Sequence, residues 1–113
     1  MTDQQYRFSL RRALEFEDRD AYVSDLSLSS IWDDEPDAGI PPDRIDLLGS
    51  IYDAAHRSVR DIAAAAGLSH RKLAERFCIP YRTMENWCGG QSSCPSYILL
   101  MMQECLGLLP RWS

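Results

Sequence analysis

Four polar side chains near the middle of the chain suit hydrogen bonding to nucleic-acid bases. They are Tyr81, Arg82, Glu85 and Asn86. In a helix that begins near Pro80, these positions share an outer face, whereas Met84 and Trp87 lie three residues apart on the inner face. The outer face is polar and is therefore capable of reading base edges.

A second helix has to hold this face in place. The residues before Pro80 are of the types that two short, steeply crossing helices require. Two short helices cross at a steep angle only if a small residue lies at the crossing and apolar residues fill the corner. Ala74 is the small residue, Leu73 and Phe77 form the apolar face, and Ile79 fills the turn. We expect these apolar residues and the inner face of the second helix to be core, whatever the pair binds.

Capping residues and helix breakers indicate the helix boundaries. Ser58 and Asp61 have the spacing of a capping box, Gly67 can end the helix that they begin, and Ser69 is the next N-cap. Alternating β-branched stretches are few, so the chain is predicted to be all-α. The expected helices are 8–16, 19–32, 43–57, 59–66, 70–77, 80–88 and 95–106.

Two of these helices have informative apolar patterns. Spacings of three and four place Ile45, Leu48, Tyr52 and Ala55 on one stripe. The last helix is apolar nearly all round, which is unusual for a helix at the surface of a monomer. We expect it either to be enclosed by the N-terminal helices or to contact a second copy of the chain.

Charge divides the chain into two parts. The net charge of −5 argues against a nucleic-acid partner, because neutralising phosphates requires Lys and Arg. However, residues 1–57 carry 13 Asp and Glu against 6 Lys and Arg, whereas residues 58–113 carry 4 against 6. We therefore expect an acidic helical extension over 1–57 and a helix-turn-helix domain over 58–113.

Residues 67–87, which read GLSHRKLAERFCIPYRTMENW, resemble the helix-turn-helix of Cro/CI-like (XRE-type) repressors. In that family the run G-L-S/T-Q-x-x-L/F-A-x-x-x-G-I-P-x-R-T-I/V-x-x-W is frequent. This chain departs from it at His70, where the family often has Gln. It also departs at Cys78, where Gly usually adopts a positive φ that costs other residues about 1 kcal/mol.

The resemblance implies a repressor-like helix-turn-helix bundle that binds double-stranded DNA and regulates transcription, as a repressor on a phage or mobile element. The outer face of residues 81–86 would lie in the major groove, with Arg82 suited to guanine and Asn86 to adenine. Related repressors usually bind as homodimers. The residues implied to contact phosphates are His70, Arg71, Lys72, Arg76, Thr83, Gly90 and Gln91.

The acidic first half supports an alternative from another class. A carboxylate cluster could present a phosphate-like surface to a nucleic-acid-binding protein. The chain would then be an inhibitor of the anti-CRISPR-like or antitoxin-like kind, with an autoregulatory helix-turn-helix. A third possibility is a structural or interaction module without DNA contact. The acidic candidates for a protein-partner surface are Asp33, Asp34, Glu35 and Asp37.

Other classes of function have little support. No combination of nucleophile, base and carboxylate indicates an enzyme, and no cofactor is expected. The four cysteines lack the paired short spacings of a zinc site, so we expect no metal and reduced thiols. The first residues do not resemble a secretory signal, and the apolar run 97–102 is too short to span a bilayer. The expected compartment is the cytoplasm.

Overall fold

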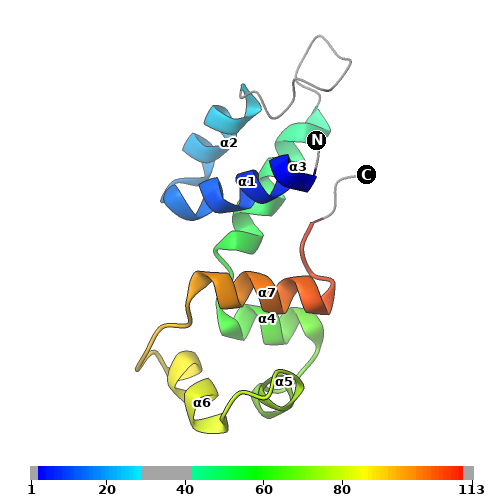
Figure 1. Ribbon diagram of the computed structural model, residues 1–113. Coiled ribbons are helices and arrows are strands. Elements are labelled where there is room, and N and C mark those ends of the chain that lie inside the picture. Colours follow the sequence, from blue (N-terminus) through cyan, green and yellow to red (C-terminus); the bar gives the residue numbers. More distant parts are fainter. Residues whose placement is uncertain (1–2, 29–41, 111–113) are drawn as a thin grey trace. The chain divides into compact units, whose positions relative to one another are not determined.

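The computed structural model describes residues 3–28 and 42–110, which form helices and no strand, as predicted (Figure 1). The helices are α1 (Asp3–Glu15), α2 (Arg19–Ser27), α3 (Pro42–Ala55), α4 (Val59–Ala66), α5 (His70–Arg76), α6 (Tyr81–Gly89) and α7 (Ser96–Leu106). None of these helices is long and apolar enough to cross a membrane.

The chain forms two compact units. The first contains the described residues up to His56 together with Pro110, and the second contains Arg57–Leu109. Pro110 belongs to the first unit, where the Tyr6 hydroxyl donates a hydrogen bond to its carbonyl oxygen.

The core of the first unit lies where α1 and α2 pack against α3. Tyr22 and Leu26 of α2 and Leu48 and Ile51 of α3 are fully buried. The Tyr22 ring lies 5.6 Å from the Tyr52 ring, measured between centroids. Leu10 and Ala13 of α1 are buried as well, so apolar side chains of all three helices form this core. Burial of such side chains is the main source of stability of a small unit.

The buried side of α3 differs from the expected stripe at its beginning. Leu48, Tyr52 and Ala55 are buried as predicted, but Ile45 is 44% exposed and the neighbouring Arg44 is buried. The prediction for Ile45 was wrong because the buried stripe follows positions 44, 48, 51 and 55, which leaves position 45 on the flank. The elongated stem of an arginine can cover apolar surface.

Helices α1 and α2 also differ in extent from the expectation. Helix α1 begins at Asp3, five residues earlier than predicted, and its first turns bury Tyr6 and Ser9. Helix α2 begins as expected at Arg19, where the Asp18 carboxylate accepts a hydrogen bond from the Ala21 amide (3.0 Å), but it ends at Ser27 rather than at position 32. Periodicity alone missed the first turn of α1 because Asp3, Gln4 and Gln5 are all polar.

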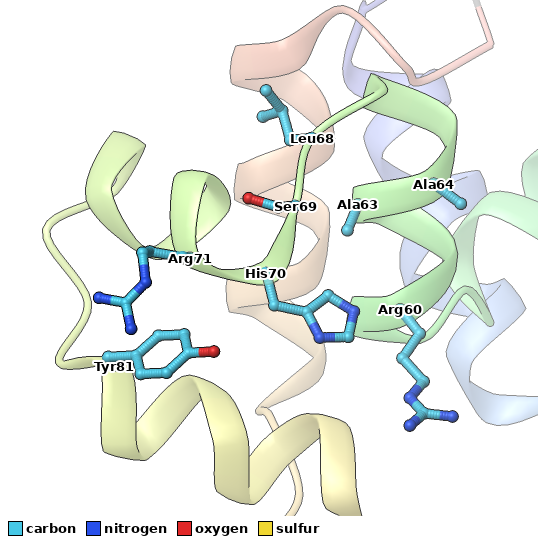
Figure 2. Close-up of a pocket in the computed structure, with 8 residues that line it drawn as sticks. All are labelled: Arg60, Ala63, Ala64, Leu68, Ser69, His70, Arg71 and Tyr81. Atoms are coloured by element: carbon cyan, nitrogen blue, oxygen red, sulfur yellow. The ribbon is translucent and has the colours of Figure 1, made fainter.

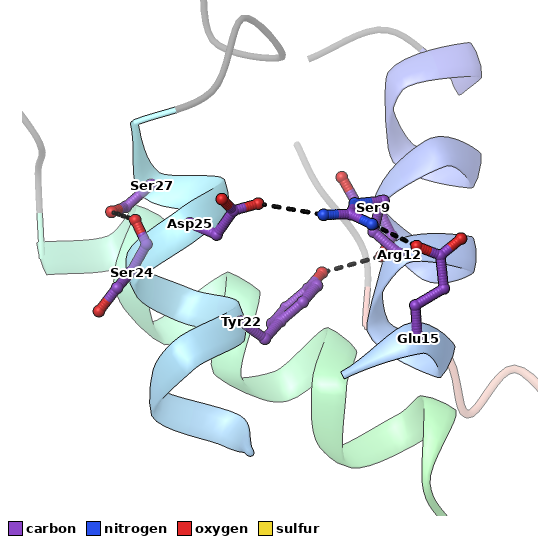
Figure 3. Close-up of polar contacts among 7 residues, drawn as sticks. All are labelled: Ser9, Arg12, Glu15, Tyr22, Ser24, Asp25 and Ser27. Carbon is purple, nitrogen blue, oxygen red and sulfur yellow. Dashed lines mark hydrogen bonds and ion pairs between the residues drawn. The ribbon is translucent and has the colours of Figure 1, made fainter. Parts of the chain in front are cut away.

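The Tyr22 hydroxyl is a buried polar group with a well-placed hydrogen-bond partner. It donates to the Ser9 carbonyl oxygen across 2.9 Å (Figure 3). Burial raises the pKa of Tyr22 above its ordinary range, and the nearby Tyr6 raises it further. The ionised form is therefore disfavoured in the folded unit but not in the unfolded chain.

This shift predicts a loss of stability at high pH. Unfolded tyrosine ionises near pH 10, so the contribution of Tyr22 is intact below that pH and decreases above it, by up to about 1.4 kcal/mol per pH unit. We expect the free energy of unfolding, measured in urea between pH 8 and 11, to fall more steeply for the wild type than for Tyr22→Phe. Parallel profiles would show that Tyr22 does not titrate with unfolding.

The second unit has its own core. Its fully or nearly fully buried members are Val59, Ile62, Ala63, Leu73, Ala74, Met84 and Met102. They come from all four helices of the unit, and Figure 1 shows α4 and α7 side by side. The small alanines allow the helices to approach closely, and the isoleucine, leucine and methionine side chains fill the space around them.

Local caps set the boundaries of α4 and α5 as predicted. The Ser58 hydroxyl accepts from the Asp61 amide (3.1 Å) and the Asp61 carboxylate accepts from the Ser58 amide (3.1 Å), which completes a capping box. Gly67 ends α4 with φ +69°, and the Ser69 hydroxyl accepts from the Lys72 amide (3.1 Å). Each such cap contributes about 1 kcal/mol.

The turn between α5 and α6 places Cys78 at φ +55°, the left-handed conformation expected from the position of Gly in the repressor pattern. Replacing Cys78 with Gly is expected to raise the free energy of unfolding by about 0.5–1 kcal/mol, since glycine adopts this conformation without a steric penalty. Urea denaturation measures the change. The matched control is Cys78→Ala, which removes the thiol but keeps Cβ. Equal gains in the two variants would show that the thiol, not the backbone, is responsible.

Candidate nucleic-acid interface

Helices α5 and α6 pack against each other through the residues predicted for a helix-turn-helix corner. Ala74 is 2% exposed, and Leu73 and Met84 are completely buried. Phe77 and Trp87 are partly buried against the same core. These five residues pack between the two helices, so apolar packing holds the inner side of α6 against α5.

The opposite side of α6 carries the four predicted base-contacting residues. Tyr81, Arg82 and Glu85 are exposed, whereas Asn86 is half-buried. The backbone carbonyl oxygen of Asn86 accepts hydrogen bonds from the backbone amides of Gln91 (3.0 Å) and Ser92 (3.3 Å). The loop after α6 therefore folds back on the last turn of this helix. The more accessible part of the polar face is formed by Tyr81, Arg82 and Glu85 in the first part of α6.

Helix α5 contributes the cations next to this face. Arg71, Lys72 and Arg76 are exposed, and none of them forms an ion pair with a carboxylate in the described residues. The same holds for Arg82 of α6. Their charge is not neutralised within the unit and is therefore available to an anionic partner.

The first unit differs in this respect. Its Arg12 pairs with Glu15 and with Asp25, the latter at 3.4 Å, as Figure 3 shows. Arg19 pairs with Asp53 at 3.0 Å. The hydrogen bonds to these carboxylates raise the pKa of both arginines. Cationic side chains of the first unit are thus largely committed to its own acidic residues.

Arg71 and Tyr81 connect the beginnings of the two helices. The guanidinium carbon of Arg71 lies 4.3 Å from the centroid of the Tyr81 ring, a cation–π contact visible in Figure 2. Such a contact contributes about 0.5–1 kcal/mol at an exposed site. It holds the Arg71 charge close to the first turn of α6, so Tyr81 positions a cation in addition to presenting its own hydroxyl.

The other predicted phosphate contacts lie around the same two helices. His70 is half-buried at the start of α5, and Thr83 is half-buried on α6. Gly90 and Gln91 are exposed, and Gly90 ends α6 with φ +83°. The predicted residues are therefore distributed over the start of α5, the polar face of α6 and the loop that follows α6.

The acidic candidates Asp33, Asp34, Glu35 and Asp37 lie outside the described residues. The protein-partner surface that they were predicted to form stays a prediction.

Arg60 was not predicted as a site residue. It is exposed in the first turn of α4 and lines a surface hollow together with His70, Arg71 and Tyr81. No sequence signal identifies Arg60 as a site residue. The packing of α4 against α5 and α6 brings Arg60 near His70, Arg71 and Tyr81, and no regular spacing along the sequence predicts that packing.

The four cysteines lie in the second unit. All four are free thiols, and no group of three or more potential metal ligands occurs in the part of the chain that the structure describes. Burial raises the pKa of the Cys94 thiol to about 11. Burial also raises the pKa of Cys88, although the charge of Arg60 opposes this shift.

Comparison of the chain with protein-family models, curated proteins and solved structures finds no match.

Proposed function

We propose that this protein is a sequence-specific, double-stranded DNA-binding regulator of the Cro/CI-like type, acting as a repressor. The observation that carries the proposal is the two-sided character of α6. Its inner residues are anchored in a core shared with α4 and α5, whereas its outer residues Tyr81, Arg82 and Glu85 are exposed and polar. An α-helix presented in this way fits the width of the major groove.

In the proposed complex, α6 enters the major groove and α5 crosses the backbone. Arg82 donates two hydrogen bonds to guanine and Asn86 pairs with adenine, whereas Arg71, Lys72 and Arg76 contact phosphates. The absence of intramolecular ion pairs at these three cations, within the described chain, favours this role. A cation that is already paired would have to break that pair before it could bind DNA.

Glu85 adds a constraint on the preferred base sequence. Its carboxylate is exposed on the same face as Arg82 and would repel a phosphate. It can, however, accept a hydrogen bond from the amino group of cytosine. We infer that the preferred site places a cytosine opposite Glu85, next to the guanine read by Arg82.

The proposed regulator acts as a homodimer. Tyr97 and Met101 of α7 lie one turn apart and are 66% and 62% exposed, so they offer an apolar contact on the second unit. Two recognition helices read two half-sites, which provides a specificity that one short helix lacks.

Selection of bound duplexes from a random pool by the purified full chain tests both parts of the proposal. We expect an enriched palindrome whose half-sites are about 10 base pairs apart, and an affinity that decreases steeply with salt. Enrichment of a single half-site would contradict the homodimer. A pool that stays random, with no duplex binding at low salt, would contradict DNA recognition altogether.

A further inference from the structure

An open hollow of about 470 Å³ lies on the second unit between α4 and the beginnings of α5 and α6 (Figure 2). Its polar lining includes Arg60, His70, Arg71 and Tyr81. Small side chains of α4, Ala63 and Ala64, supply part of its apolar wall. No Asp or Glu lines the hollow in the described chain.

The polar groups around the hollow favour an anion. Arg60 and Arg71 each carry a permanent positive charge, and neither forms an ion pair with a described carboxylate. The Tyr81 hydroxyl and the His70 imidazole can donate further hydrogen bonds. Because Arg71 already rests on the Tyr81 ring, part of its side-chain entropy is lost before any ligand binds.

The size and wall of the hollow indicate more than a bare ion. At about 470 Å³ the hollow has room for more than a bare ion, and its wide opening leaves one side of a ligand exposed to solvent. The carbon-rich face of a sugar can pack against the alanine side chains, while its phosphate reaches one arginine at the rim. Arg60 and Arg71 lie on opposite sides of His70 in Figure 2. The guanidinium geometry suits phosphate oxygens especially well.

We propose that this hollow binds a sugar–phosphate segment and that Arg60 of α4 is one of its phosphate contacts. The segment belongs either to a DNA strand, in which case the inference rests on the proposed function, or to a free sugar phosphate. Arg60 then extends the DNA-binding surface from α5 and α6 onto α4.

The test compares Arg60→Gln with Arg11→Gln in the full chain. Arg11 is an exposed arginine of α1 in the first unit, so both variants remove one positive charge. In the first arm, binding to a 20-base-pair mixed-sequence duplex (about two helical turns) is measured at several salt concentrations. We expect Arg60→Gln to weaken binding about fivefold and to reduce the salt slope by about one, with no change for Arg11→Gln.

The second arm titrates deoxyribose 5-phosphate and follows the His70 and Arg71 resonances by NMR. Saturable shifts that Arg60→Gln removes, and that Arg60→Lys partly restores, support the hollow as a site for the free ligand. Unchanged spectra of the remaining residues show that each variant is folded.

The two arms separate the two hypotheses. Arg60-dependent duplex binding without saturation by the sugar phosphate assigns the hollow to a DNA strand. Arg60-dependent saturation in a protein that binds no duplex supports the hollow and overturns the proposed function. If Arg60→Gln behaves like Arg11→Gln in both arms, the hollow is not a sugar–phosphate site, and duplex binding by the wild type would still support the proposed function.

Discussion

Replacing Met84 with Ala is expected to lower the free energy of unfolding of the second unit by about 3 kcal/mol. The Met84 side chain is completely buried in the cluster that joins α4, α5, α6 and α7. Its truncation removes apolar contacts and leaves a cavity, and such changes cost about 2–5 kcal/mol. Because small domains have only about 5–15 kcal/mol of stability in total, the loss would populate the unfolded unit measurably.

Urea denaturation followed by tryptophan fluorescence measures this effect, since Trp87 packs partly buried against the same cluster. The control is Leu28→Ala, a truncation of similar size at a side chain of the first unit that is 79% exposed. We expect the control to change stability by less than about 0.5 kcal/mol. Equal losses in the two variants would contradict the placement of Met84 at the centre of the core.

The second large effect concerns recognition rather than stability. Replacing Arg82 with Ala should weaken binding to the selected duplex by about 1–3 kcal/mol, which is the discrimination supplied by one bidentate contact to guanine. Arg82 is exposed and has no ion pair with a described carboxylate, so its loss should leave the urea midpoint unchanged. The measurement is the affinity for the selected duplex and for a scrambled duplex of the same composition.

A matched comparison comes from Lys72, an exposed cation of α5. Lys72→Ala should weaken binding to both duplexes equally, because a phosphate contact carries no base information. For Arg82→Ala the loss should be confined to the selected duplex. An equal loss on both duplexes would reassign Arg82 to the backbone, and an unchanged affinity would show that the polar face of α6 is not the recognition surface.

Local signals explain most of what could be predicted about the second unit. The capping box of Ser58 and Asp61, the glycine at position 67 and the cap at Ser69 act over three or four residues, so their partners can be read directly from the sequence. The corner around Ala74 was predictable for a similar reason, since close packing of two helices requires a small residue.

Features that depend on tertiary packing were not predictable. The burial of Arg44 in place of Ile45 is set by where α1 and α2 cover α3. Arg60 joins His70 and Tyr81 only because α4 lies against the other two helices. Apolar periodicity identifies a face of a helix, but it does not identify which neighbouring helix covers that face or which polar side chains meet at its edge.

Arg57, the first residue of the second unit, donates hydrogen bonds to the Gln103 side-chain oxygen (2.9 Å) and to the Leu108 carbonyl oxygen (3.2 Å). The polypeptide therefore enters and leaves this unit at neighbouring points, and the residues flanking it on both sides, His56 and Pro110, belong to the first unit. The two ends of the segment 57–109 therefore lie close together. This proximity suits the segment to insertion into a surface loop of another protein.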